Sequence, residues 1–255
     1  MSNTKRFTGK ANAYTKARPN YPIEFINFLF NDFGIDASTT IADIGSGTGI
    51  LSKEFLERDC IVYCVEPNND MRKVAEDALS SFGNFITINA TAENTTLLDN
   101  SVDFITVAQA FHWFDTVKFK QECQRILKEA GYVFLVWNFR VEDSEIVKEN
   151  ALICKKYCPD FIGFNGGDKQ IEERIASFFD GKFTKKRFEN NLEFSKETFI
   201  KRNLSSSYSI QENDKEFQDY VSELETLFDK HAVNNILHMP NETIVYFGRI
   251  ELKSP

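Results

Sequence analysis

The sequence predicts an α/β protein built on a doubly wound, mostly parallel sheet of seven strands with a helical cover. The first reason is that short apolar runs alternate with amphipathic helical patterns from residue 22 to residue 139, which is typical of a parallel sheet. The second is that two further strand-like stretches, 183–194 and 242–251, come after Arg140, where the regular alternation of strands and helices ends. A chain of 255 residues is long enough for one such domain with added segments.

The elements of the first half follow one another in regular order. Pro22 can begin a helix with the apolar face Phe25, Ile26, Leu29, Phe30 and Phe33, and Gly34 can end it. Next come a strand that ends in Asp43, a glycine turn, and a helix through Leu51, Phe55 and Leu56. The remaining elements are a strand over Cys60–Glu66, a helix from Met71 to Phe82, strands over Phe85–Ala90 and Val102–Ala110, a helix from about Asp115 to Ala130 before Gly131, and a strand over Tyr132–Phe139.

The second half is expected to add helices and two strands to this sheet. Helical patterns cover about 143–157, 168–180, 196–204 and 214–232, and strand patterns cover Phe183–Phe194 and Glu242–Glu251. The two late strands are expected to pair like a hairpin beside the parallel strands. We expect a single domain over 1–255, with an N-terminal lid over 1–22 and with insertions at about 141–180 and 195–240 that cover the substrate side.

Charge and composition argue against several classes of partner. The formal net charge of −8 and the pI near 5.1 give no general attraction to nucleic acids or anionic membranes. The first ten residues lack the apolar core of a signal peptide, and no apolar run approaches the roughly 20 residues of a membrane span. Five cysteines, mostly inside apolar-periodic stretches, predict buried, reduced thiols in a cytoplasmic protein. We therefore expect no nucleic acid, no membrane and no metal, although Cys154 and Cys158 would share a helix face.

The stretch TIADIGSGTGILSKEF, residues 40–55, indicates a nucleotide site. Its glycines, which allow backbone to approach a ligand closely, are Gly45, Gly47 and Gly49. The dinucleotide fingerprint G-x-G-x-x-G requires a third glycine where this sequence has Ile50 or Ser52. Asp43 precedes the turn, and a carboxylate there disfavours a phosphate and suits a ligand with an ammonium and a sulfonium group.

A second acid supports the same kind of ligand. Glu66 ends the second predicted strand, 23 residues after Asp43 (66 − 43), where an acid can accept both hydroxyl groups of a ribose. The ligand expected from the two acids has a free ribose diol and a positively charged tail without phosphate. S-adenosylmethionine has both features.

The stretch from Ile41 to Phe139 resembles class I S-adenosylmethionine-dependent methyltransferases. Three motifs carry the resemblance: ADIGSGTG, CVEPNNDM and ATAENTTLLDNSVDFITVAQAFHWFD. The stretches RFTGKANAYTKARPNYP and AQAFHWFD are similar to a narrower group, the type 11 and trans-aconitate-methyltransferase-like enzymes. The resemblance implies a Rossmann-like methyltransferase fold, S-adenosylmethionine as the cofactor and a small molecule as the acceptor. It is weakest from about 141 to 240, where such enzymes choose their substrates.

The resemblance also implies which residues bind the cofactor. These are Asp43 toward its amino end, Gly45, Ser46 and Gly47 in the turn, Glu66 on the ribose, Asn68 and Met71 around the adenine and ribose, Ala92 and Glu93 at the adenine edge, Gln109 through its carbonyl group, and Tyr14 and Arg18 in the lid, with Arg18 pairing the methionine carboxylate. Thr91 stands where many members carry an acid, which favours the backbone N–H of Ala92 as the adenine partner. Met71 as plain core, and Tyr14 and Arg18 as a surface helix, remain alternatives.

The acceptor side is expected near His112, Trp113 and Tyr208. His112 and Trp113 follow the fourth strand, at the edge where doubly wound sheets bind ligands, and Tyr208 lies in a polar loop of the cover. His112 is either an acceptor-side residue, acting as a base or orienting the acceptor, or a hydrogen-bonded structural histidine. No catalytic residue is assigned, because in-line displacement at a sulfonium methyl group needs mainly alignment of donor and acceptor.

The predicted function is S-adenosylmethionine-dependent methyl transfer to a small molecule by direct in-line displacement. A carboxylate or another anionic metabolite is one candidate acceptor, because the cover carries Lys155, Lys156, Lys169, Arg174, Lys201 and Arg202, while the acceptor atom stays open. Two alternatives remain. One is a non-catalytic S-adenosylmethionine-binding sensor or interaction protein. The other is a nicotinamide-dependent oxidoreductase, which Ile50 and Asp43 oppose.

Overall fold

The computed structural model describes residues 19–164, 170–206 and 208–251, and these divide into two compact units. The first unit comprises the described residues up to Trp137, the segment Gln170–Phe188, and the described residues from Ile244 onward. The second comprises the described parts of Asn138–Lys169 and Glu189–Thr243. This division differs from the predicted insertions at about 141–180 and 195–240, because residues 170–180 pack with the first unit.

A sheet in the order β3-β2-β1-β4-β5-β9-β6 is the framework of the fold. Its strands are β1 (Thr40–Ile44), β2 (Ile61–Val65), β3 (Phe85–Ile88), β4 (Val102–Ala108), β5 (Leu127–Arg140), β6 (Thr184–Glu189) and β9 (Asn241–Gly248). β1 pairs in parallel with β2 and with β4, β2 pairs with β3, and β4 pairs with β5. The strand order reverses between β1 and β4, and a doubly wound sheet has its ligand crevice at such a point. The seven-stranded, mostly parallel α/β sheet expected from the sequence is confirmed.

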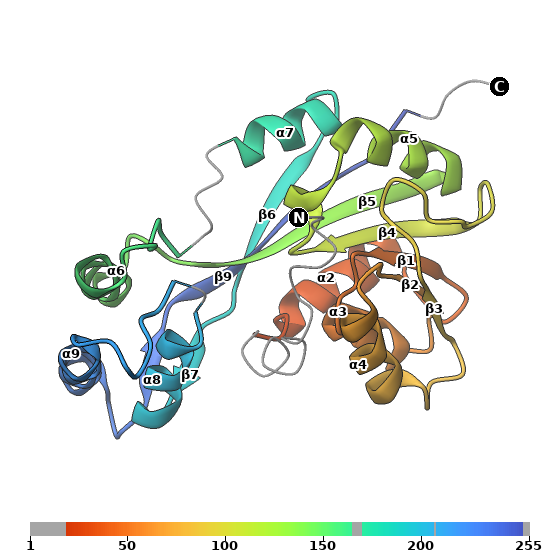
Figure 1. Ribbon diagram of the computed structural model, residues 1–255. Helices are drawn as coiled ribbons and strands as arrows, with labels where there is room; N and C mark the ends of the chain where they lie inside the picture. Colours follow the sequence, from red (N-terminus) through yellow and green to blue (C-terminus); the bar gives the residue numbers. More distant parts are fainter. Residues whose placement is uncertain (1–18, 165–169, 207, 252–255) are drawn as a thin grey trace. The chain divides into compact units, whose positions relative to one another are not determined.

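Helices cover both faces of the strands in the first unit (Figure 1). α2 (Ile23–Phe33), α3 (Ile50–Leu56) and α4 (Asn69–Leu79) lie on one face, and α5 (Thr116–Ile126) and α7 (Ile171–Phe178) lie on the other. The apolar spacing of α2 turns Phe25, Ile26 and Leu29 toward the strands, where all three are fully buried. On the other face, Phe119 of α5 stacks on Phe178 of α7 with ring centroids 5.4 Å apart, which holds α7 in the first unit.

The boundary between α5 and β5 differs from the sequence prediction. α5 ends at Ile126 and not near Ala130, because Leu127 already pairs with Val102 at the start of β5. Gly131 lies inside β5, where a Cβ atom would come within 2.6 Å of the Asp103 carbonyl oxygen. The glycine therefore permits a close approach of two strands and does not end a helix.

The single strand predicted over Phe183–Phe194 is wrong, because the chain forms two strands of different sheets there. β6 ends at Glu189, and β7 (Leu192–Phe194) pairs antiparallel with β8 (Leu237–Met239). Asn190 lies between them, and its N–H donates to the Asn241 carbonyl oxygen (2.9 Å) while its side-chain amide donates to Thr243 Oγ1 (3.2 Å). The alternating pattern runs through this break, so periodicity alone does not reveal it. The neighbourhood of the two late strands is confirmed, since β9 lies next to β6.

The second unit has its own apolar core. It is formed by α6 (Glu145–Tyr157), α8 (Lys196–Leu204), α9 (Phe217–His231), β7 and β8. Tyr220, Leu224 and Leu237 are fully buried in it. Among all the helices described, none combines the length and the apolar composition that crossing a bilayer requires.

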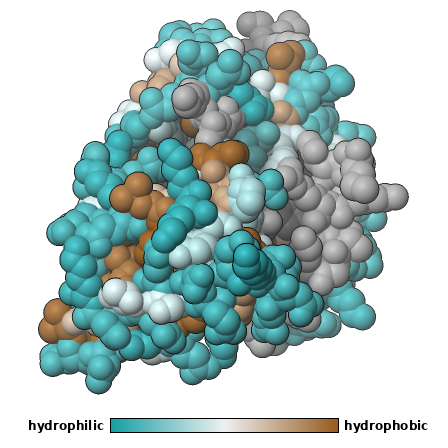
Figure 2. Space-filling model, turned by 60° about the vertical axis from the view of Figure 1, so that its left-hand side comes forward, coloured by the Kyte–Doolittle hydropathy of each residue, from teal (hydrophilic) through white to brown (hydrophobic). Residues whose placement is uncertain are grey.

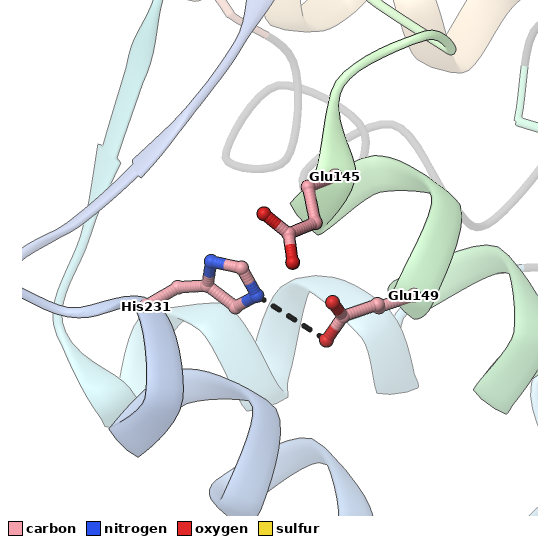
Figure 3. A group of neighbouring side chains, drawn as sticks. All are labelled: Glu145, Glu149 and His231. Carbon is pink, nitrogen blue, oxygen red and sulfur yellow. Dashed lines mark hydrogen bonds and ion pairs between the residues drawn. The ribbon is translucent and has the colours of Figure 1, made fainter.

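A group of charged side chains joins α6 to α9 (Figure 3). Glu145, Glu149 and His231 place their side-chain ligand atoms within 4.8 Å of one another, a spacing that would suit a metal ion. Lys230 Nζ donates to Glu149 (2.6 Å) and to Glu145 (3.5 Å), and His231 Nε2 lies 3.2 Å from Glu149 Oε2. The lysine ammonium group thus balances the two carboxylates, and we describe the group as an ion pair between helices.

Candidate functional site

The loop between β1 and α3 carries three glycines in left-handed backbone conformation. The φ angle is +69° at Gly45, +58° at Gly47 and +80° at Gly49, a region that L side chains rarely adopt. A Cβ atom at Gly45 would lie 2.7 Å from Ala110 Cβ, and one at Gly49 would lie 2.5 Å from Leu79 Cδ1. A Cβ atom at Gly47 would meet none of the described atoms within 4 Å. Among the described residues, the Cβ position of Gly47 is therefore open, and a ligand can approach the backbone there.

The carboxylate of Asp43 is almost fully buried at the end of β1. Strand side chains alternate, so Asp43 lies on the same face of β1 as Ile41, toward α3. Ser52 Oγ donates to Asp43 Oδ2 (2.6 Å), and Thr106 Oγ1 donates to Asp43 Oδ1 (2.9 Å). Burial raises the pKa of Asp43 to about 6, although the two hydroxyl bonds act in the opposite direction.

Glu66 follows β2 and bonds directly to the glycine loop. Its Oε2 accepts the Gly47 N–H (3.0 Å), and its Oε1 accepts the Asn68 N–H (2.7 Å). Burial raises the pKa of Glu66, and Asp43 adds to this, while the two backbone bonds and Arg72 oppose it. Each carboxylate oxygen has a second acceptor position, so Glu66 can accept two more donors. This capacity suits a pair of hydroxyl groups.

Other predicted residues near the loop have local partners. Ser46 donates its N–H to the last carbonyl group of β2 (3.2 Å). Asn68 caps α4, since its Oδ1 accepts from the N–H groups of Asp70 (3.0 Å) and Met71 (3.1 Å), and the Met71 side chain is buried. The Thr48 hydroxyl is buried and has no hydrogen-bond partner among the described residues. Buried polar groups are nearly always bonded, so this hydroxyl is an exception next to the glycine turn.

The chain makes a strained turn where β4 ends. Gln109 has a φ angle of +59°, which is uncommon for a residue other than glycine, and its N–H donates to the Val136 carbonyl oxygen (2.9 Å). Strain of this kind persists where surrounding contacts fix it, and it is concentrated at functional sites. Ala110 follows and lies against Gly45, so this turn touches the glycine loop.

His112 and Trp113 lie in a short 3-10 turn, Phe111–Trp113, just beyond Gln109. Their ring centroids are 4.4 Å apart, and both side chains are partly exposed. Arg174 of α7 fixes the turn, because its guanidinium group donates to the carbonyl oxygens of His112 (3.3 Å) and Phe114 (3.0 Å).

The loop after β3 carries Ala92 and Glu93. Ala92 is buried, while Glu93 Oε1 accepts the N–H of Asp115 (3.0 Å), the residue that caps α5. The Glu93 carboxylate thus joins this loop to α5. The adenine role of either residue stays a prediction.

The first unit brings most of the predicted cofactor residues to one edge of its sheet. They are Asp43, Gly45, Ser46, Gly47, Glu66, Asn68 and Gln109. Tyr208 belongs to the second unit, and Tyr14 and Arg18 lie outside the described residues. Sequence reasoning missed Ser52 and Thr106, the two donors to Asp43. Their signal in the sequence is a polar residue inside an apolar pattern, which identifies no partner.

Comparison with known proteins identifies part of the first unit. Residues 42–135 match the family model described as a methyltransferase domain. An uncharacterized methyltransferase of Mycobacterium tuberculosis (strain ATCC 25618 / H37Rv) is 38% identical over 143 residues, which cover 56% of this chain and 56% of that protein. An uncharacterized methyltransferase of Schizosaccharomyces pombe is 28% identical over 169 residues, which cover 66% of this chain and 63% of that protein. The aligned stretch thus spans little more than half of the mycobacterial relative.

Solved structures share the fold over a greater length. For a candidate type II methyltransferase from Anaeromyxobacter dehalogenans the TM-score is 0.65 at 19% identity, and the alignment covers 92% of this chain and 99% of that chain. For the YcgJ protein from Bacillus subtilis the TM-score is 0.56 at 18% identity, with 91% and 100% covered. Likenesses at these identities show a shared fold.

The glycine loop gives a prediction about stability: Gly45→Ala should destabilise the protein more than Gly47→Ala. Both substitutions force a side chain into left-handed backbone, at a cost of roughly 1–2 kcal/mol. Only the alanine at position 45 also collides with Ala110, which adds about 1–3 kcal/mol of overpacking. Urea unfolding measures both losses, with Gly83→Ala as the control, since a Cβ atom at Gly83 has room. Equal losses at the two loop positions would contradict the geometry.

Asp43 gives a prediction about pH. A carboxyl group with a pKa of about 6 in the folded state and 3.8 without burial favours its protonated form on folding. Its stabilising contribution is complete below about pH 4 and is lost as the pH rises through about 6, on the order of 3 kcal/mol in total. Asp43→Asn cannot ionise, so its free energy of unfolding relative to the unaltered protein should rise from about pH 4 to about pH 7. A relative free energy that does not change with pH would refute this assignment.

Proposed function

We propose that residues 42–135, which match the family model of a methyltransferase domain, belong to a class I S-adenosylmethionine-dependent methyltransferase, and that the protein transfers a methyl group to a small-molecule acceptor by direct in-line displacement. One observation carries the proposal: Glu66 bonds to the Gly47 N–H at the glycine loop, close enough to the buried Asp43 to feel its charge. Two acids at this place oppose a phosphate and suit a ribose with a positively charged substituent.

The described residues have room and polar capacity for this cofactor. The Cβ position of Gly47 is open among the described residues, and Glu66 keeps two acceptor positions for the ribose hydroxyl groups. We assign the Gln109 carbonyl group to the cofactor's ammonium group and the Ala92 N–H to the adenine, as the sequence resemblance implies.

The main contribution that the protein has to make is to align the acceptor with the methyl group of the cofactor. Bound S-adenosylmethionine supplies an electrophilic methyl group, and a carboxylate acceptor needs no base to react with it. His112 is proposed to orient the acceptor, with Trp113 as a wall beside it. Arg174 supports both by holding the carbonyl groups of their turn.

The second unit contains the guanidinium group of Arg140 beside an aromatic ring. Arg140, the last residue of β5, places its guanidinium carbon 3.7 Å from the centroid of the Phe164 ring. Burial lowers the pKa of Arg140, so its positive charge lies in a weakly polar surrounding, where attraction to an anion is strong. Tyr208, a predicted acceptor residue, is near enough that Arg140 acts to lower its pKa, which burial raises. We propose a carboxylate or similar anion as the acceptor because of the lysine and arginine residues in the part of the sequence expected to cover the substrate side.

The cellular setting is part of the same proposal. Five buried thiols without a disulfide suit a reducing compartment, which supports a cytoplasmic location. The net charge of −8 supports a small-molecule partner over a nucleic acid.

Binding measurements test the cofactor. We expect isothermal titration calorimetry to detect S-adenosylmethionine and S-adenosylhomocysteine but not NAD. Glu66→Gln should weaken S-adenosylhomocysteine binding about tenfold to a hundredfold, because a neutral amide replaces a charge-assisted acceptor. Glu172→Gln is the matched control, since Glu172 of α7 bonds to Lys185 and Tyr246. NAD binding without a response to S-adenosylhomocysteine would overturn the proposal, and unchanged affinity in folded Glu66→Gln would remove Glu66 from the site.

A tritiated-methyl survey tests transfer and the acceptor class together. Metabolite pools are first separated by anion exchange, and we expect the label in the retained, anionic pool. Label only in neutral or cationic pools would contradict the anionic acceptor. Intact cofactor binding with no labelled product in any pool would favour the sensor alternative.

A further inference from the structure

The loop between β3 and β4 contains two residues other than glycine that have a strained backbone conformation. Thr96 has a φ angle of +63° and Asn100 has one of +51°, both in the left-handed region. Asparagine tolerates this region, but a β-branched threonine there is a genuine outlier. Such a conformation persists only where the surroundings over-determine it, and it occurs disproportionately at ligand-binding loops.

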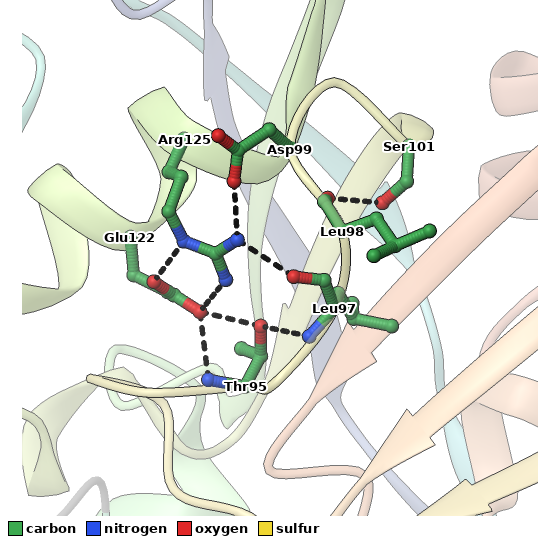
Figure 4. Close-up of polar contacts among 7 residues, drawn as sticks. All are labelled: Thr95, Leu97, Leu98, Asp99, Ser101, Glu122 and Arg125. Atoms are coloured by element: carbon green, nitrogen blue, oxygen red, sulfur yellow. Dashed lines mark hydrogen bonds and ion pairs between the residues drawn. The ribbon is translucent and has the colours of Figure 1, made fainter.

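An ion pair on α5 holds the residues on both sides of Thr96 (Figure 4). Glu122 Oε1 accepts the Thr95 N–H (2.7 Å) and the Thr95 hydroxyl (2.5 Å). Arg125 Nη1 donates to the Leu97 carbonyl oxygen (2.6 Å), and its other nitrogens donate to both carboxylate oxygens of Glu122 (2.7 and 3.0 Å). The backbone before and after the outlier is therefore fixed by one carboxylate and one guanidinium group, and the Thr95 hydroxyl adds a longer bond from the Leu97 N–H (3.3 Å).

The carboxylate of this pair is buried, while the Arg125 side chain is 34% exposed and lies at the edge of the interior. Thr95 is fully buried, and Glu122 is only 7% exposed. Burial by itself raises the pKa of Glu122, but the bonds from Arg125 and Thr95 outweigh it, so the net pKa lies below the usual value and the carboxyl group stays ionised. Arg125 also donates to Asp99 (2.7 Å). Charge-assisted bonds of this kind are the stronger and more directional ones.

The same loop carries the predicted adenine residues. The Asn94 N–H donates to the Thr91 carbonyl oxygen (3.2 Å), so residues 91–94 form a turn that presents Ala92 and Glu93. The turn ends directly at Thr95, where Glu122 holds the chain, and Glu93 is held in addition by the N–H of Asp115. Both anchors belong to α5 or its cap.

We propose that Glu122 and Arg125 are positioning residues that hold the 91–101 loop in the strained geometry with which the Ala92 backbone distinguishes adenine from other bases. The inference rests on the proposed function, because it assumes that this edge of the first unit binds the adenosine part of S-adenosylmethionine. Neither side chain touches the cofactor in this proposal. Their effect reaches it through the backbone on either side of Thr96.

Calorimetry with two ligands that differ only in the base tests the proposal. S-adenosylhomocysteine carries adenine, and S-inosylhomocysteine carries hypoxanthine, which has a carbonyl group in place of the amine. The unaltered protein should prefer the adenine ligand. Glu122→Gln should lower the affinity for S-adenosylhomocysteine about tenfold or more and bring the ratio of the two affinities toward one, because only adenine recognition needs the held turn. Glu172→Gln, a paired acid on α7, should keep both the affinity and the ratio.

If Glu122→Gln does not fold, a less disruptive variant tests the same proposal. Thr95→Val removes the hydroxyl bond to Glu122 and the longer bond that the hydroxyl accepts from the Leu97 N–H (3.3 Å). It leaves the ion pair with Arg125 in place, so it should shift the ratio in the same direction by a smaller factor. A merely stabilising role for the pair would lower the melting temperature without changing the ratio. A folded variant with lower stability and an unchanged ratio therefore overturns the proposal. If the unaltered protein binds neither ligand, the proposed function itself fails.

Rescue tests the link to the strained residue. In the double variant Glu122→Gln/Thr96→Asn, the threonine is replaced by a residue that tolerates left-handed backbone, and the exposed position 96 has room for it. The double variant should recover a large part of the adenine preference that Glu122→Gln loses. An adenine preference as low as that of Glu122→Gln alone would overturn the role of the pair in holding Thr96.

Discussion

The buried carboxylate of Asp43 in β1 forms hydrogen bonds to α3 and to β4, and it thereby fixes both ends of the glycine loop. In the sheet register Asp43 lies beside Thr106 of β4, and its other donor, Ser52, is the third residue of α3. A carboxylate removed from water must be hydrogen-bonded, so these two bonds fix where α3 begins relative to β1 and β4. The chain between Asp43 and Ser52 then has to turn sharply, which left-handed glycines permit. One result is that the Gly47 N–H is directed at Glu66.

The order of strands and helices in the first unit could be predicted because each element is long enough to show its period. The end of α5 could not, since Lys128–Ala130 favour a helix by propensity and the pairing of Leu127 with Val102 is a tertiary contact that overrides it. β7 and β8 are three residues long, which is too short for any period to appear. Local patterns therefore predict regular elements well and predict their ends poorly.

The residues of the candidate site likewise fall into those that could be predicted from the sequence and those that could not. Gly47 and Glu66 could be placed from spacing, because the parallel pairing of β1 with β2 brings the ends of consecutive strands together. Thr106 and Glu122 could not, because Thr106 bonds to a residue 63 positions away and Glu122 to one 27 positions away. A polar residue in an apolar pattern signals that it has a partner without saying which one. The residues that hold a site in shape are thus harder to find in a sequence than the residues that face the ligand.

Because the pKa of Asp43 is about 6, the charge of its carboxyl group changes with pH under mildly acidic conditions. Under the proposed function, the ligand enters with a positive sulfur and leaves with a neutral one, while Asp43 stays where it is. An ionised carboxylate attracts the charged substrate more than the neutral product, and a protonated one treats the two nearly alike. The competition between substrate and spent cofactor then depends in part on whether Asp43 carries its proton. Product inhibition should ease as that proton leaves and grow stronger as it returns.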